Sequence, residues 1–489
     1  MHDNPSSQLL SSADPSVLAD EYQKYDGLGL AELVRKKQVT PLELLTAVRQ
    51  RVELLNPKLN ALCHLFFDKA EAQIDQGLGN GLFRGVPFVL KDLGVYLTGT
   101  ITSAGSRIWK NTVASFDSTL VSRYKKAGLV IFGKSNSPEI GLTVTTESVL
   151  FGLTRNPWNL GLTAGGSSGG SAAIVASRIV PMAHGSDAGG SIRIPASCCG
   201  VFGFKPTRGR VPTGPSQFEG WNGCSHHHAL TISVRDSAAL LDVSGGRETG
   251  SPFFSPVPER PFLEEVAKPP GNLRIAMITA STTGAVLDPQ CQEAVSNAAK
   301  LCEGLGHRVD ETDLPINPET LRAAFLTVLQ VSLARTLDDT VTTLGRQVSE
   351  RDVETVTWAM AEAAANITSV AYSRAIATLH QIGLAMARFQ ENYDVILSPT
   401  LSKPAVGLGV LSLSQDPAIY GTAITEFMHS TSLYNATGQP SMSVPLHWTP
   451  DGLPIGVMFS GRFGEDALLF RLAAQLEKAK PWANRRPPF

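Results

Sequence analysis

Apolar residues recur every three or four positions after Thr40, which is the spacing of one face of an α-helix. Thr40 can cap this helix, Pro41 suits its first position, and Glu43 completes a capping box. The pair Asn56-Pro57 predicts its end. The apolar stripe consists of Leu44, Leu45, Val48, Val52 and Leu55.

Short apolar runs then alternate with helical patterns. Residues 85–90 predict a buried strand, residues 118–127 a helix, and residues 128–134 the next strand. This alternation is typical of α/β proteins. Residues 288–389 read as mostly helical. Further strands are expected at 273–278, 393–397, 441–448 and 455–460, and a closing helix at 466–480.

The organisation predicted from these patterns is a loose N-terminal leader, residues 1–26, followed by one domain over residues 27–489. A length of 489 residues also allows about three domains of ordinary size. Residues 245–270 are rich in Pro, Ser and Gly and predict a linker or a long surface loop.

Composition and charge exclude several classes of protein. Hydrophobic residues make up 43% and charged residues 18%, which excludes bulk disorder. The net charge of −2 gives no basic surface for nucleic acid or anionic membranes. The apolar run at 171–183 contains Arg178 and Pro181 and is too short to span a bilayer. We expect a soluble, cytoplasmic monomer or homodimer that binds no nucleic acid and no membrane.

The six cysteines are too sparse for a disulfide scaffold, and none lies in a CxxC pair that would indicate zinc. Cys198 and Cys199 are expected to pack as small buried side chains. Three consecutive histidines, His226, His227 and His228, lack a fourth ligand and are expected in a loop beside the cleft rather than at a metal.

A first candidate site is the run Gly-Gly-Ser-Ser-Gly-Gly-Ser at residues 165–171, placed directly before an apolar helical pattern. A glycine-rich loop that opens a helix offers free backbone N–H groups to an anion or an oxyanion. A flexible linker has the same composition. A phosphate-binding loop is disfavoured, because neither the Lys-Ser/Thr pair nor the G-x-G-x-x-G spacing is present.

Two further segments offer catalytic groups. Gly189 and Gly190 precede Ser191, so the backbone there can turn its N–H groups towards one point beside a nucleophile, or simply form a tight turn. Lys91 follows an apolar strand directly. In a pocket poor in water its pKa would fall and it could act as a base, whereas most lysines are solvated.

Together these segments resemble the amidase signature family. Residues 87–92 resemble the family's lysine strand, residues 165–171 its glycine-serine signature, and residues 187–195 its nucleophile segment. The resemblance runs from about residue 27 to residue 483. Its later motifs are matched by residues 204–209, 435–440 and 452–456.

The resemblance implies a role for each residue. Ser191 would be the nucleophile, and Ser167 the bridging serine, which in the family follows a cis peptide bond. Lys91 would be the base, acting through Ser167. The oxyanion would be bound by the backbone N–H groups of Ala188, Gly189, Gly190 and Ser191.

Gly141 and Thr143 would line the acyl side of the cleft. The family implies one α/β domain in which helices cover both faces of a central mixed sheet. Residues 250–390 would form a mostly helical elaboration that caps or borders the cleft. The family needs no metal or organic cofactor. Its reaction is hydrolysis of a carboxylic amide through an acyl-enzyme, and members also cleave aryl esters and carbamates (urethanes). Residues 155–161 and 481–487 resemble the branch that cleaves nylon-type cyclic amide oligomers.

Neighbouring residues fit supporting roles. Asp187 and Arg193 are expected to hold the nucleophile loop in shape, and Asp92 is assigned no catalytic role. His184 precedes Ser191, but no G-x-S-x-G elbow surrounds that serine, which disfavours a serine–histidine hydrolase.

Two other functions stay open. One is the catalytic subunit of a glutamine-dependent aminoacyl-tRNA amidotransferase, which would use the same three residues with partner subunits. The other is a ligand-binding module without catalysis, whose glycine loops hold an anion. The second leaves the combination of Lys91, Ser167 and Ser191 unexplained.

Overall fold

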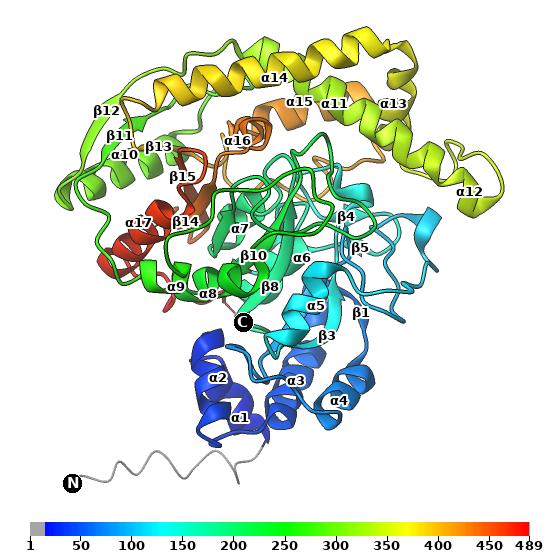
Figure 1. Ribbon diagram of the computed structural model, residues 1–489, viewed down its shortest axis with the longest axis vertical. Coiled ribbons are helices and arrows are strands. Elements are labelled where there is room, and N and C mark those ends of the chain that lie inside the picture. The colour runs from blue at the N-terminus through cyan, green and yellow to red at the C-terminus, as the bar shows by residue number, and fades with distance from the viewer. Residues whose placement is uncertain (1–14, 489) are drawn as a thin grey trace.

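Two β-sheets form the centre of the fold in the computed structural model, which describes residues 15–488 (Figure 1). The larger is an eight-stranded mixed sheet with the order β12-β11-β13-β15-β14-β9-β10-β8. Its strands are β8 (Met182–Asp187), β9 (Phe202–Lys205), β10 (His226–Thr231), β11 (Arg274–Met277), β12 (Arg308–Glu311), β13 (Val395–Pro399), β14 (Ser441–Trp448) and β15 (Pro454–Gly461).

The smaller sheet has three strands in the order β1-β3-β2. Its strands are β1 (Leu62–Leu65), β2 (Pro87–Lys91) and β3 (Val130–Ser135). Strand β2 lies beside β8, so the two sheets meet along one seam. Two small hairpins lie outside both sheets and pair β4 (Glu147–Ser148) with β5 (Gly152–Leu153) and β6 (Arg155–Asn156) with β7 (Asn159–Thr163).

Helices cover both faces of the larger sheet, as expected, because successive side chains of a strand point to opposite faces. In β13, Val395 and Leu397 pack among residues of α10 and α17, whereas Ile396 packs among residues of α11, α14 and α16. These helices are α10 (Pro289–Gly304), α11 (Pro318–Asp339), α14 (Ser369–Phe389), α16 (Thr431–Thr437) and α17 (Asp466–Ala479).

The remaining helices complete the cover. In Figure 1, α1 to α4 lie at the bottom, and α11 and α14 run across the top. They are α1 (Pro15–Tyr22), α2 (Gly27–Arg35), α3 (Pro41–Leu59), α4 (Phe67–Asp75), α5 (Thr119–Lys126), α6 (Gly169–Ala176), α7 (Arg193–Cys199), α8 (Val234–Ser244), α9 (Phe262–Glu265), α12 (Val341–Leu344), α13 (Thr355–Ala363) and α15 (Pro417–Phe427).

The N-terminal segment differs from the expected loose leader. Residues 1–14 lie outside the described part of the chain, but α1 is a helix, and its Leu18 and Tyr22 are buried in the core. Helix α3 also passes the predicted end at Asn56-Pro57. Pro57 lies in its last turn, where the missing N–H costs one hydrogen bond, and the helix stops at Asn60, which adopts a left-handed conformation.

The segment 250–390 is not only helical. Strands β11 and β12 extend the main sheet by parallel pairing, and the first of them was predicted whereas the second was not. Residues 245–261 form the expected irregular surface segment inside the fold. Helix α11 borders the cleft described below, as expected of this elaboration.

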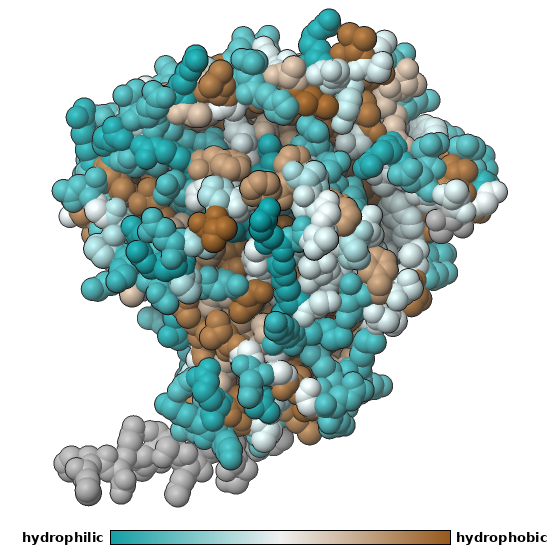
Figure 2. Space-filling view, in the orientation of Figure 1, coloured by the Kyte–Doolittle hydropathy of each residue, from teal (hydrophilic) through white to brown (hydrophobic). Residues whose placement is uncertain are grey.

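Polar side chains cover most of the face seen in Figure 2, with apolar residues scattered in small groups. Among residues 15–488, no helix is long and apolar enough to cross a bilayer. All six cysteines are free thiols, and Cys198 and Cys199 are buried as expected.

The capping box of α3 generates a stability prediction. The hydroxyl of Thr40 accepts the Glu43 N–H at 3.2 Å, and the Glu43 carboxylate accepts the Thr40 N–H at 2.7 Å. We expect Thr40→Ala to lower the free energy of unfolding by about 1 kcal/mol. Thr46→Ala, an exposed position within the same helix, is the control and should change it by less than about 0.5 kcal/mol. Urea denaturation followed by circular dichroism measures both, and equal effects would contradict a role for the cap.

Candidate active site

Lys91 is the last residue of β2 and is fully buried. The apolar strand before it places the lysine side chain in the interior, where two hydroxyl groups contact its nitrogen. Nζ lies 2.7 Å from Ser167 Oγ and 3.0 Å from Ser186 Oγ. The structure thus brings the predicted base and the predicted bridging serine into direct hydrogen-bond contact.

Burial lowers the pKa of Lys91 to about 7, because the charged form loses its hydration. The carboxylate of Asp187 opposes this shift only in part. That carboxylate is already paired with Arg193, so it does not neutralise the lysine. A substantial fraction of Lys91 is therefore a neutral amine near neutral pH, which is the form that can accept a proton.

Ser167 precedes α6, and the peptide bond between Gly166 and Ser167 is cis, as the family resemblance implied. The backbone here is closely packed, since a Cβ on Gly166 would lie 2.2 Å from the Thr145 carbonyl oxygen. The next residue ties this loop to the nucleophile loop: the Ser168 N–H donates to the Ser191 carbonyl at 3.1 Å. Ser167 and Ser191 both line the same cleft.

The nucleophile loop, residues 188–191, joins β8 to α7. Its carbonyl groups are occupied by the surrounding protein, since Gly189 O accepts from Thr431 Oγ1 at 2.6 Å and Gly190 O accepts from Ile194 N at 2.7 Å. The N–H groups of Ala188, Gly189 and Ser191 have no acceptor among residues 15–488. Ala188 and Gly189 are half-buried, and Ala188 and Ser191 line the cleft, so these three N–H groups are open to an anionic atom bound there.

Gly190 differs from its neighbours in this loop. Its N–H donates to Asp187 Oδ1 at 2.8 Å, so it is not available to an oxyanion, contrary to the role that the resemblance implied. Gly190 instead permits a backbone angle φ of 132°, and a Cβ there would lie 2.5 Å from Thr431 Oγ1. Its contribution is to the shape of the loop.

Asp187, Arg193 and Asn435 form a fully buried cluster beneath the nucleophile loop. Arg193 NH2 donates to Asp187 Oδ1 at 2.8 Å and to Asn435 Oδ1 at 2.6 Å, and Asn435 Nδ2 donates to the Asp187 carbonyl at 2.9 Å. The guanidinium holds the pKa of Asp187 well below its usual range despite burial. The expected shaping role of Asp187 and Arg193 therefore has a structural basis.

The cleft above these groups has a volume of about 350 Å³. Gly141 lines it, whereas Thr143 does not: its hydroxyl donates to the Leu411 carbonyl at 3.1 Å, which places it behind the wall. The larger lining side chains are Leu93, Tyr96, Trp109, Ile140, Gln217, Glu219, Trp221, His227 and Arg335.

Sequence reasoning missed three contributors to this site. Ser186, whose hydroxyl also contacts Lys91, comes immediately before residues 187–195, the segment that resembles the nucleophile segment. Asn435 heads a motif that was matched without a role, and its contacts come from a helix far along the chain. Thr431, which holds the Gly189 carbonyl, carries no local signal.

The three consecutive histidines are not in a loop. They begin β10, where burial lowers the pKa of each imidazole. Alternation along the strand sends His226 and His228 to one face and His227 to the other. His228 contacts Ser237 Oγ at 2.9 Å, whereas His227 contacts His184 at 3.0 Å, so the three rings do not converge on a metal ion.

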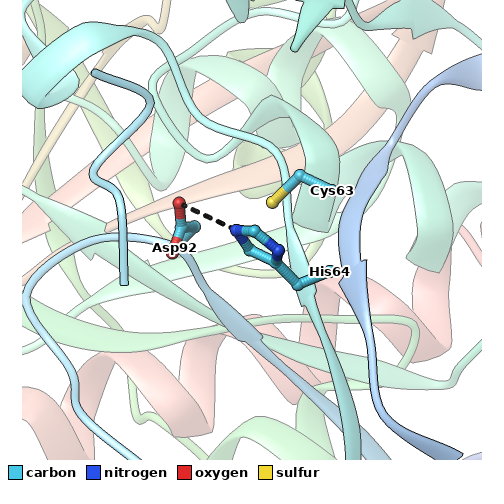
Figure 3. Close-up of side chains that lie close together, drawn as sticks. All are labelled: Cys63, His64 and Asp92. Carbon is cyan, nitrogen blue, oxygen red and sulfur yellow. Dashed lines mark ion pairs between the residues drawn. The ribbon is translucent and has the colours of Figure 1, made fainter. Parts of the chain in front are cut away.

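Cys63, His64 and Asp92 form the group of possible metal ligands found among residues 15–488 (Figure 3). His64 Nε2 lies 4.0 Å from Asp92 Oδ2, and the sulfur of Cys63 lies beside them. The same carboxylate accepts from the backbone N–H of Ser103 at 3.1 Å and lies 3.8 Å from the ammonium of Lys134. A cation already faces Asp92, so this donor set fits a buried ion pair better than a metal centre.

Comparison with known proteins shows which family the chain belongs to. Its sequence matches the family described as Amidase over residues 43–470. The chain therefore belongs to the amidase family and is a hydrolase of carboxylic amide C–N bonds. The sheet and helix arrangement expected from the sequence is confirmed by this match and by related structures.

Particular relatives are similar over nearly their whole length. The chain is 39% identical to a 6-aminohexanoate-cyclic-dimer hydrolase of Pseudomonas sp. (strain NK87), an alignment that covers 94% of this chain and 96% of the relative. A solved structure of 6-aminohexanoate cyclic dimer hydrolase with its substrate matches with a TM-score of 0.89 and 37% identity, covering 95% of this chain and 99% of the other.

The amidotransferase alternative has a more distant match. A solved glutamyl-tRNA(Gln) amidotransferase chain of Thermotoga maritima superposes with a TM-score of 0.74 at 28% identity, covering 97% of each chain. The shared fold is clear, but the similarity is lower than that to the cyclic dimer hydrolase. The comparisons thus favour the amidohydrolase interpretation of the sequence.

Gly141 provides a test of how tightly this site is built. Its φ is 69°, and a Cβ there would lie 2.6 Å from Leu93 Cδ2 and 3.1 Å from Ser167 Oγ. We expect Gly141→Ala to displace Ser167 and to lower kcat/KM for an anilide substrate by about ten- to a hundredfold.

The control is Gly383→Ala in α14, where an added Cβ has no neighbour within 4 Å. It should keep wild-type activity. Equal activity of the two variants would show that the position of Ser167 tolerates the extra methyl group.

Proposed function

We propose that the protein hydrolyses small-molecule amides and carbamates through an acyl-enzyme on Ser191, with Lys91 as the base and Ser167 as the bridge. The observation that carries this proposal is the buried hydrogen bond of 2.7 Å between Lys91 Nζ and Ser167 Oγ. The lowered pKa of about 7 makes part of Lys91 a neutral amine, and its contact with Ser167 Oγ is the geometry that a proton relay requires.

The reaction begins with proton transfer. Neutral Lys91 takes the hydroxyl proton of Ser167 while Ser167 takes that of Ser191, whose Oγ forms a bond to the carbonyl carbon of the substrate. The carbonyl oxygen becomes an oxyanion, which the free N–H groups of Ala188, Gly189 and Ser191 bind.

Collapse of this intermediate breaks the C–N bond. The proton held on Lys91 returns through Ser167 to the leaving amine, which departs as a neutral molecule and leaves an ester on Ser191. Water then repeats the sequence, losing its proton to the relay and releasing the carboxylic acid. Ser186 gives the lysine amine a second hydroxyl contact, which fixes the direction of its lone pair towards Ser167.

The cleft supports the proposed substrate class. Among its lining residues only Glu219 and Arg335 carry a formal charge, and Leu93, Trp109, Ile140 and Trp221 contribute apolar surface. A volume of about 350 Å³ suits a molecule of modest size. Similarity to the cyclic dimer hydrolases adds nylon-type amides to the candidates, and carbamates share the same acyl carbon chemistry.

We further propose that residues 15–488, with α1 included, act as one domain, in the cytoplasm, as a monomer or homodimer without a nucleic acid partner. The span of the family match, the free thiols and the net charge of −2 support this assignment. No metal or organic cofactor takes part in the proposed steps.

Turnover of a substrate panel tests the proposal. The panel contains an acyl anilide, a linear nylon-type amide, an aryl carbamate, an aryl ester and glutamine. We expect cleavage of amide or carbamate members, and a fall in kcat of at least about 10⁴-fold in Ser191→Ala. Ser122→Ala, at an exposed serine of α5, is the matched control. Cleavage of glutamine alone would instead favour the amidotransferase function.

The pKa of Lys91 sets the pH dependence. The base acts in its neutral form, and its neutral fraction grows as pH rises through the lowered pKa of about 7. We therefore expect kcat/KM to rise with pH around this value and to reach a plateau at mildly alkaline pH. Lys91→Arg stays charged and should be inactive throughout. An activity maximum at acid pH would contradict a lysine base.

A further inference from the structure

Two hydrogen-bonded histidines connect the backbone of the lysine strand to the wall of the cleft. The rings of His184, in β8, and His227, in β10, lie with centroids 5.2 Å apart and planes 15° apart. His184 Nδ1 is 3.1 Å from the backbone nitrogen of Lys91, and His184 Nε2 is 3.0 Å from His227 Nδ1. The steps of the mechanism proposed above use neither ring.

The hydrogen bonds fix the tautomer of both rings. The backbone N–H of Lys91 can only donate, so His184 Nδ1 must accept and the proton of a neutral His184 must sit on Nε2. That N–H donates to His227 Nδ1, which must therefore accept in turn. The proton of a neutral His227 consequently sits on Nε2, at the far end of the chain of hydrogen bonds.

Both rings are neutral over the working pH range. Burial and the neighbouring His227 hold the pKa of His184 well below its usual value, and burial with nearby Lys91 lowers that of His227 to about 4. Protonating either ring would place two N–H donors face to face or against the Lys91 N–H. All bonds in this chain of hydrogen bonds therefore run in one direction, from the backbone N–H of Lys91 through His184 to His227.

His227 delivers this last donor to the cleft. It pairs in register with Ser186, the residue whose hydroxyl contacts Lys91, and it lines the cleft together with Ser191 and Gly94. A Cβ on Gly94 would lie 3.0 Å from His227 Cε1, so the glycine leaves that edge of the ring open. His227 Nε2 has no partner among residues 15–488.

We propose that His227 is a substrate-positioning residue that donates a hydrogen bond from Nε2 to an oxygen of the substrate other than the scissile carbonyl. The inference rests on the proposed function and narrows its substrate class. Preferred substrates carry a second acceptor oxygen, as in diamides and bis-carbamates, within reach of the β10 wall. A substrate that offers only an N–H group to His227 finds no acceptor on that ring, because Nδ1 is occupied by His184.

The tautomer can be measured without turnover. In the full-length protein labelled with ¹⁵N-histidine, the His227 signals are assigned by their loss in His227→Gln. We expect a protonated, pyrrole-type nitrogen at Nε2 and an unprotonated, pyridine-type nitrogen at Nδ1 at neutral pH. The reverse tautomer would overturn the proposal, whatever the enzyme hydrolyses.

The role in positioning is tested with two matched pairs of substrates. On the acyl side, ε-acetamidohexanoyl para-nitroanilide is compared with nonanoyl para-nitroanilide. On the amine side, the butyryl amide of para-acetamidoaniline is compared with that of para-propylaniline. Within each pair, one substrate carries a second carbonyl with its neighbouring nitrogen, and the other carries an alkyl chain of the same length in their place.

His227→Phe keeps a ring against His184 but removes the donor. In one of the two pairs, this substitution should lower kcat/KM about 3- to 10-fold for the substrate that carries the acetamido group. It should leave kcat/KM for the matched substrate of that pair unchanged. His227→Gln, which can accept from His184 and donate to the cleft, should restore most of the loss. Equal losses for both members, or none in either pair, would overturn the proposal. If the wild-type enzyme cleaved none of these substrates, the proposed function would be wrong. The NMR measurement would then decide by itself whether Nε2 of His227 carries the proton.

Discussion

The hydrogen-bonded burial of Lys91 is the interaction on which the rest of the site depends. An amine placed in the interior without charged partners loses its proton readily, and the surrounding hydroxyls give the neutral form a direction. For this to work, the carboxylate that favours the charged form of Lys91, that of Asp187, must be occupied elsewhere. The pairing of Asp187 with Arg193 and Asn435 meets that requirement, and the same cluster shapes the loop that carries Ser191. The same buried contacts thus influence both the pKa of the base and the position of the nucleophile.

Much of the fold could be predicted because its elements carry strong local signals. The apolar stripe and capping box of α3, the buried runs of β2 and β3, and the closing helix α17 all appear close to their predicted positions. Strand β12 was missed because its residues, Arg308–Glu311, are mostly charged and lie at the sheet edge, where pairing with β11 supplies the structure. The histidines of β10 were assigned to a loop because their burial depends on strands on both sides.

The candidate site shows the same division between local and distant information. Lys91, Ser167 and Ser191 could be named because each lies in a distinctive segment, and the structure brings them to one cleft. The state of individual backbone groups could not be read in this way. Whether the N–H of Gly190 is free depends on where the side chain of Asp187 turns, and whether Thr143 lines the cleft depends on a carbonyl at Leu411.

The seam between the two sheets has a consequence for how the enzyme loses activity. The base stands on a strand of the smaller sheet, whereas the nucleophile stands beyond a strand of the larger one, and β2 and β8 are adjacent without a ladder of paired backbone groups between them. A small slip along this boundary separates the amine from its serines while each sheet keeps its own pairing and core. Heat or denaturant can therefore abolish activity at temperatures or concentrations where spectroscopic probes still report intact secondary structure.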